Sequence, residues 1–150
     1  MDFDLVIIGS GPGGYVAAIR GAQLGLKVAI VEKEALGGVC LNWGCIPTKS
    51  FLRSAEVLKI IKDSDKYGIK SKLGDIDIRE VVKRSRSIAK KLSSGVEYLL
   101  KKNKVVIFDG EASLKTSKSI VITSKNYGVK EISSKNICIA SGGRPREISG

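Results

Sequence analysis

The sequence contains no histidine and is poor in cysteine, proline, methionine and aromatic residues. Its 150 residues include three cysteines, three prolines, one methionine and one tryptophan. The cysteines are odd in number, and their positions at 40, 45 and 138 do not suit the disulfide framework of a small secreted domain. Because histidine is absent, the chain cannot supply the four ligands of a closed zinc site. We therefore predict no metal centre.

Long apolar runs are also missing. No run approaches the roughly 20 residues that a membrane helix needs. The apolar run near the N-terminus is short and follows Asp2 and Asp4, so it does not have the form of a signal peptide. We expect a cytoplasmic protein with no membrane partner. In a reducing compartment, paired cysteines are more often redox-active or metal-binding than structural.

Acidic residues are too few to balance the basic ones. The chain has 26 lysines and arginines against 15 acids, a net charge of +11, and the excess lies after residue 50. A basic chain raises the question of nucleic-acid binding. The lysines are spread along expected helices and hairpins, aromatic residues make up only 5%, and no nucleic-acid motif is present. We predict a solvated lysine-rich surface and no nucleic-acid partner.

The first 32 residues predict a dinucleotide-binding unit. An apolar strand at 3–8 leads into a glycine-rich loop with G-x-G-x-x-G spacing, and a helix at 15–24 and a strand at 27–31 follow. The loop is Gly9-Ser10-Gly11-Pro12-Gly13-Gly14, and the second strand ends at Glu32. A generic βαβ unit with glycine turns is the alternative. The surrounding strands, helix and acid favour the nucleotide-binding interpretation.

Each part of this unit has an expected task. Gly9 permits a sharp turn, Gly11 a close approach to a pyrophosphate, and Gly14 close packing of helix on strand. The phosphates would lie at the helix N-terminus. Glu32 would accept hydrogen bonds from a ribose diol. NAD and FAD share this fingerprint, so the loop alone does not separate them.

The rest of the chain predicts further elements of one α/β domain. Two long amphipathic helices are expected at 45–61 and 78–102, joined by a polar connection, and the apolar stripe of the second is expected to pack on the sheet. A third central strand is expected at 104–108 and a last buried strand at 136–140, with a small antiparallel meander between them at 111–114, 119–123 and 129–132. The last strand runs into Ser141-Gly142-Gly143, at the strand end where open α/β sheets bind ligands. We predict a Rossmann-like domain with a central parallel sheet, helices and this meander over residues 1–150.

Cys40 and Cys45 lie in a glycine-rich stretch, Gly37 to Lys49, for which three uses compete. Zinc lacks ligands, since Cys138 is expected within a buried strand. Two inert core thiols are a second use, although glycines on both sides indicate a loop that closely approaches something else. A redox dithiol fits best, because Cys45 lies near the start of a helix, where the dipole favours a thiolate. Pro47 supports that helix start, and Lys49 adds positive charge.

The stretch from Gly38 to Lys49 resembles the active-site signature of the flavin-dependent pyridine nucleotide–disulfide oxidoreductases. Leu41, Ile46 and Thr48 resemble its dihydrolipoamide dehydrogenase branch. The resemblance covers essentially the whole chain, including the first glycine loop and the turn at 141–143. Three positions depart from the family pattern without removing a reacting group: Val39, Trp43 and Ser141.

The resemblance implies roles for individual residues. Cys40 would be the outer thiol that exchanges with dihydrolipoamide, Cys45 the inner thiol against the flavin, and Lys49 a neighbour of the reactive edge of the ring. Glu32 would hold the adenosine ribose, and the backbone at Glu111 and Ala112 would meet the adenine. The FAD-binding residues expected in all are Gly9, Ser10, Gly11, Pro12, Gly13, Gly14, Glu32, Lys33, Gly38, Val39, Cys40, Cys45, Lys49, Glu111, Ala112, Ser141, Gly142 and Gly143.

The resemblance also shows what this chain does not contain. Family members carry NAD-binding and dimerisation domains after this point, and their catalytic base is a histidine. Here there is no histidine and no second G-x-G-x-x-G for NAD. We expect the first segment of a FAD domain, ending in a crossover at 144–150 and not competent alone. The parent would be a homodimer that oxidises dihydrolipoamide on the acyltransferase subunit of a 2-oxo acid dehydrogenase complex and passes the electrons through FAD to NAD. A stand-alone FAD-binding or small dithiol redox module is the alternative.

Overall fold

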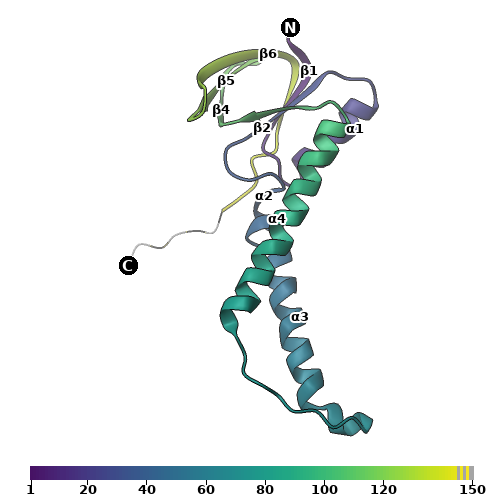
Figure 1. Ribbon diagram of the computed structural model, residues 1–150. Helices are drawn as coiled ribbons and strands as arrows, with labels where there is room; N and C mark the ends of the chain where they lie inside the picture. Colours follow the sequence, from purple (N-terminus) through teal and green to yellow (C-terminus); the bar gives the residue numbers. More distant parts are fainter. Residues whose placement is uncertain (145, 147, 149–150) are drawn as a thin grey trace.

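The computed structural model describes residues 1–144, 146 and 148. Most of the expected crossover at 144–150 therefore lies outside the described residues. Figure 1 shows a sheet covered by helices and, extending from it, a long hairpin of two helices. The elements are β1 Phe3–Ile8, α1 Pro12–Gln23, β2 Val28–Glu32, α2 Gly38–Asn42, α3 Cys45–Lys62, the 3-10 helix η1 Ser64–Tyr67, α4 Ile78–Lys102, β3 Val106–Asp109, β4 Glu111–Thr116, β5 Ser119–Ser124 and β6 Gly128–Ile139.

The six strands form one mixed sheet in the order β3-β2-β1-β6-β5-β4. β1 pairs in parallel with β2 and with the second half of β6, and β2 pairs in parallel with β3. β4, β5 and the first half of β6 form the antiparallel meander. This confirms the predicted α/β class, with a parallel centre and an antiparallel extension. The parallel strands end at the same edge, where Ile8 is in register with Val31 and Ile139.

Two apolar clusters hold the layers together. On one face of the parallel strands, α1 and the C-terminal end of α4 pack on the sheet through buried residues that include Ile7, Ile30 and Leu100. On the other face the meander folds over the sheet, and Ile120 and Ile122 are buried against it. The alternating burial along β5 matches the period-2 pattern of its sequence.

β6 corrects two predictions. The segments expected at 129–132 and 136–140 are one continuous strand of 12 residues. The polar residues between them do not break it, because Ser134 is completely buried and its hydroxyl donates to the Asn136 carbonyl at 2.7 Å. The second half was also expected to be buried, but Ile139 is 64% exposed. Ile139 belongs to neither of the two apolar clusters, so its side chain does not reach a core.

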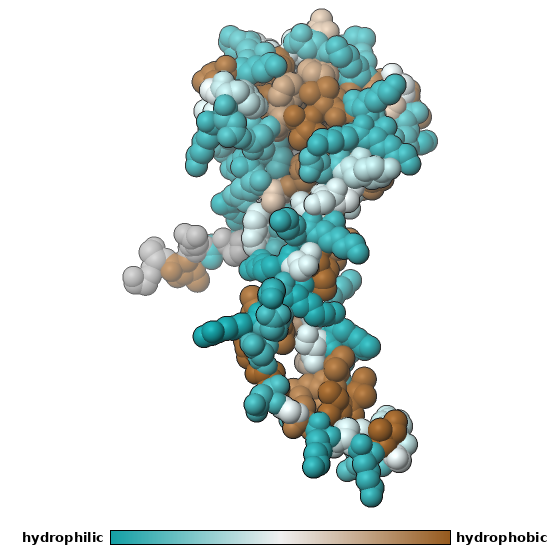
Figure 2. All heavy atoms as spheres, in the orientation of Figure 1, coloured by the Kyte–Doolittle hydropathy of each residue, from teal (hydrophilic) through white to brown (hydrophobic). Residues whose placement is uncertain are grey.

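α4 corrects a third prediction. Its apolar stripe was expected to pack on the sheet, and only its C-terminal part does so, through Val96 and Leu100. The N-terminal part runs beside α3 and away from the sheet (Figure 1). Ile78 there is 64% exposed, and Figure 2 shows hydrophobic side chains among hydrophilic ones along this hairpin. Helical periodicity indicates which face of a helix is apolar, but it does not identify what packs on that face. In the part of the chain that the structure describes, no helix combines the length and apolarity that a membrane crossing requires.

Candidate functional site

A cavity of about 280 Å³ opens at the carboxyl ends of β1, β2 and β6. Its volume is near the lower end of the ~300–1,000 Å³ typical of ligand pockets. The structure brings together around it most of the residues expected from the sequence: Gly9, Ser10, Gly11, Pro12, Glu32, Lys33, Gly38, Val39, Cys40, Glu111, Ala112, Ser141, Gly142 and Gly143. Four expected residues do not line it: Gly13, Gly14, Cys45 and Lys49. The cavity lies where strand ends of an open α/β sheet converge, which is the usual place for a ligand in such sheets.

Several lining residues were not expected from the sequence. Trp43 and Gly110 are two of them, together with Glu34, Ala35 and Arg144. Gly110 directly follows β3, so the rule that ligands bind at strand ends could have identified it. Trp43 lies between the two cysteines and is half exposed. No sequence pattern indicates that its side chain turns toward the cavity.

The N-terminus of α1 suits a pyrophosphate. Gly11 is its N-cap, no side chain caps it, and the first turn contains no acid. Backbone N–H groups in that turn therefore lack a side-chain partner, and with the helix dipole they favour an anion. Close packing sets the position of the turn, because a Cβ on Gly14 would lie 1.9 Å from the Gly9 carbonyl oxygen. The residues present thus fit the phosphate end of a dinucleotide.

Glu32 and Ser10 form the polar centre of the site. One oxygen of the Glu32 carboxylate accepts from the Ser10 N–H at 2.9 Å and the Ser10 hydroxyl at 2.6 Å. The other accepts from the N–H groups of Lys33 and Glu34. Ser10 is completely buried, and its carbonyl accepts from the Gly37 N–H at 3.0 Å. Glu32 therefore joins the glycine loop to the end of β2, a structural role that the sequence did not indicate.

A second charged pair lies at the rim of the cavity. Lys33 Nζ and Glu111 Oε1 are 2.7 Å apart, and both side chains are largely exposed. The hydrogen bond from Lys33, with its positive charge, lowers the pKa of Glu111 below its ordinary value. The pair links the end of β2 to the start of β4. It therefore holds Glu111 and Ala112, predicted to meet the adenine, beside Glu32, predicted to hold the ribose.

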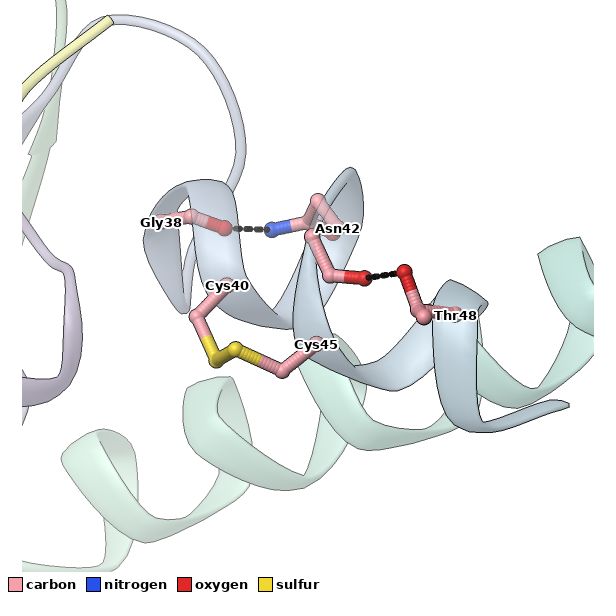
Figure 3. Close-up of a disulfide and its surroundings, with 6 residues drawn as sticks. Gly38, Cys40, Asn42, Cys45 and Thr48 are labelled. Carbon is pink, nitrogen blue, oxygen red and sulfur yellow. Dashed lines mark hydrogen bonds between the residues drawn. A yellow bond between two sulfur atoms is a disulfide. The ribbon is translucent and has the colours of Figure 1, made fainter. Parts of the chain in front are cut away.

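The cysteines are joined in a disulfide that bridges two helices, as Figure 3 shows. Cys40 lies on α2 and Cys45 is the first residue of α3, with a Cα–Cα distance of 4.8 Å. Cys45 is exposed and Cys40 is partly exposed, so the pair is not two inert core thiols. Cys138 is a free cysteine that lies in a strand, β6, as expected, but it is only partly buried. An accessible disulfide can exchange with an attacking thiolate.

α2 itself was not predicted. The sequence indicated a loop closely approaching something else, and the structure has a helix of five residues. Such a helix is too short to show a hydrophobic period. The close approach does occur at Gly38, where φ is +67° and a Cβ would lie 2.6 Å from the Gly11 Cα. α2 therefore touches the glycine loop and brings Cys40 to the cavity wall.

Comparisons with known proteins agree with this arrangement. Residues 3–150 match the sequence profile of the family described as pyridine nucleotide-disulphide oxidoreductase. The dihydrolipoyl dehydrogenase of Zymomonas mobilis is 49% identical over 146 residues, which are 97% of this chain and 31% of the relative. That of Chlorobaculum tepidum is 50% identical over 148 residues, covering 99% of this chain and 32% of the relative. That of Bacillus subtilis is 40% identical over 157 residues, covering 99% and 33%. The chain spans about a third of the length of these curated relatives.

Proposed function

The chain belongs to the pyridine nucleotide-disulphide oxidoreductase family, and from this premise we propose that it is the FAD-binding segment of a dihydrolipoyl dehydrogenase. The observation that carries the proposal is the Cys40–Cys45 disulfide, whose Cys40 lies at the wall of a cavity that begins at a G-x-G-x-x-G loop. The expected substrate is dihydrolipoamide on the acyltransferase subunit of a 2-oxo acid dehydrogenase complex. A reducing cytoplasm suits a disulfide that is consumed and regenerated at each turnover.

The residues around the cavity fit FAD part by part. The uncapped N-terminus of α1 would receive the pyrophosphate, and Glu32 the adenosine ribose. The backbone at Glu111 and Ala112 would meet the adenine, while the turn at 141–143 would close the other side. FAD, when bound, would supply a two-electron acceptor for the dithiol. NAD would be the final acceptor.

The chain's own chemistry is thiol–disulfide exchange. One thiolate of dihydrolipoamide attacks the Cys40 sulfur, the Cys40–Cys45 bond breaks, and Cys45 leaves as a thiolate. The second substrate thiol then gives its proton to the histidine expected outside these 150 residues. Its sulfur attacks the substrate sulfur bound to Cys40, which releases Cys40 as a thiolate and forms the lipoamide disulfide. Substrate oxidation thus matches reduction of the protein disulfide by two electrons. The N-terminus of α3 and nearby Lys49 favour the thiolate on Cys45.

The remaining functions are assigned to polypeptide beyond these 150 residues. They are the NAD site, the proton-accepting histidine and the homodimer contact. Two observations support this assignment: the chain spans about a third of its relatives, and it has no histidine and no second nucleotide loop. On this account the 150 residues alone do not reduce NAD.

A chimera tests the proposal. Residues 1–150 would replace the matching segment of the Zymomonas mobilis dihydrolipoyl dehydrogenase, and dihydrolipoamide-dependent reduction of NAD would be measured. We expect activity in the chimera and none in the same chimera with Cys45→Ser. A chimera that binds FAD but does not reduce NAD would contradict the proposal. NAD reduction by residues 1–150 alone would contradict the assignment of the NAD site elsewhere.

A further inference from the structure

α4 holds the polypeptide around the disulfide at three points. Arg84 Nη1 donates to the carbonyl and hydroxyl oxygens of Ser50, at 3.1 and 3.0 Å. Arg86 Nη1 donates to the Asn42 carbonyl at 3.2 Å. Ser93 Oγ donates to the Leu36 carbonyl at 2.9 Å. Of these acceptor residues, Leu36 precedes both cysteines, Asn42 lies between them and Ser50 follows them. One helix therefore holds the whole segment.

Asn42 is held by side-chain hydrogen bonds on two sides. It is 9% exposed and lies in the stretch between Cys40 and Cys45. Its side-chain amide donates to the carbonyls of Leu36 and Gly38, each at 3.0 Å, and the bond to Gly38 is drawn in Figure 3. Its own carbonyl accepts from Arg86. The end of α2 is therefore tied on one side to its own beginning and on the other to α4.

We propose that Arg86, assisted by Ser93, is a positioning residue that sets the reduction potential of the Cys40–Cys45 disulfide. The inference rests on the proposed function, because it requires the disulfide to be reduced and reformed. Reduction adds two electrons and two protons, breaks the S–S bond and leaves two thiols. With Asn42 held on α4, the two sulfurs stay close after the bond breaks. A high effective concentration of one thiol beside the other favours the disulfide.

The charge of Arg86 acts in the opposite direction. A positive charge near the cysteines stabilises a thiolate and so favours the reduced state. Loss of the hydrogen bond makes the disulfide easier to reduce, whereas loss of the charge alone makes it harder to reduce. The sign of the change therefore separates positioning from electrostatics. Arg86→Met removes both features, and Arg86→Lys keeps both a positive charge and an N–H donor.

The experiment uses the full chain in mixtures of reduced and oxidised dithiothreitol at fixed pH. Free thiols are trapped by alkylation and counted by mass spectrometry. We expect Arg86→Met to shift the equilibrium about tenfold toward the dithiol. For two electrons this makes the reduction potential ~30 mV less negative. Arg86→Lys is expected to stay within about twofold of the unaltered chain, or ~9 mV. Arg79→Met is the matched control, because Arg79 precedes Arg86 by two helical turns on the same face of α4.

Ser93→Ala gives an independent test with a smaller change of side chain. It frees the Leu36 carbonyl from α4 and is expected to shift the equilibrium in the same direction as Arg86→Met, by a smaller factor. The inference is overturned if Arg86→Met and Ser93→Ala both keep the potential of the unaltered chain, if Arg86→Met makes the disulfide harder to reduce, or if Arg86→Lys shifts the equilibrium as far as Arg86→Met. A Cys40–Cys45 pair that does not exchange with dithiothreitol at all would overturn the proposed function itself.

Discussion

Three neighbouring glycines of the nucleotide loop should respond to alanine in three different ways. Gly14 packs closely against the backbone of Gly9. A Cβ added to Gly14 would lie 1.9 Å from the Gly9 carbonyl oxygen and 3.0 Å from the Gly9 carbonyl carbon. Gly13, one residue earlier in α1, has nothing within 4 Å of that position, and Gly11 at the N-cap is equally open. The three substitutions therefore add the same methyl group to very different surroundings.

The magnitudes follow from these distances. A Cβ on Gly14 meets backbone, so α1 must move away from β1, and overpacking of this kind costs about 1–3 kcal/mol. Because neither side of the contact is a flexible side chain, we expect Gly14→Ala to lower the free energy of unfolding by ~3 kcal/mol. Gly13→Ala meets no obstacle and should raise it by about 0.5 kcal/mol, since alanine is the better helix former.

Gly11→Ala separates binding from stability. Its methyl group meets no protein atom, so the free energy of unfolding should change by less than ~0.5 kcal/mol. The same methyl group would stand between the backbone and a pyrophosphate. We expect FAD affinity to fall at least about tenfold, or ~1.4 kcal/mol.

Urea unfolding followed by far-ultraviolet circular dichroism gives the stabilities, and quenching of flavin fluorescence gives the affinity. The account of the α1–β1 contact is refuted if Gly14→Ala unfolds at the same urea concentration as Gly13→Ala. The account of the phosphate site is refuted if Gly11→Ala binds FAD as tightly as Gly13→Ala.

Two further predictions concern stability. Ser85 is 1% exposed, and in the described part of the chain its hydroxyl has no hydrogen-bond partner. Ser85→Ala should therefore raise the free energy of unfolding by about 1 kcal/mol. A urea midpoint below that of the unaltered chain would contradict this. Asp2 accepts hydrogen bonds from Ser133, and Asp4 accepts from Lys135 and from the Lys27 N–H, which lowers the pKa of both carboxyls below the ordinary 3.8. Their contribution to stability is thus present above pH 3.8 and is lost as the pH falls through their folded pKa values. In thermal unfolding, Asp2→Asn and Asp4→Asn should have lower midpoint temperatures than the unaltered chain, and this difference should be smaller at pH 3 than at pH 5. An equal difference at both pH values would contradict this origin of the stability.

The sequence predicted best the features that are encoded locally. β1, the glycine loop, α1 and β2 follow one another within 32 residues, and each is marked by its own pattern. The meander was found because alternating residues reveal a half-buried strand. The turn at 141–143 was placed at the ligand site because open α/β sheets bind ligands at strand ends.

The features that were missed depend on contacts between distant residues. Ser10 was expected as an FAD-binding residue, and only the fold shows that it also holds the carboxylate of Glu32. The polar residues inside β6 looked like a break between two strands. The sequence does not show that the first half of β6 pairs with β5 and the second half with β1, which makes the strand continuous. Arg86 looked like one of many solvated cations on α4. Its hydrogen bond to Asn42 joins residues 44 positions apart.

The central claim is that the Cys40–Cys45 disulfide lies beside a flavin and exchanges electrons with it. The visible spectrum of the FAD-loaded chain, before and after dihydrolipoamide is added, tests this most directly. We predict a flavin band that gains a long-wavelength shoulder on reduction, from a thiolate in contact with the flavin. The shoulder should be present in Cys40→Ser and absent in Cys45→Ser. A chain that takes up no FAD, or a shoulder that is unchanged by Cys45→Ser, would contradict the account.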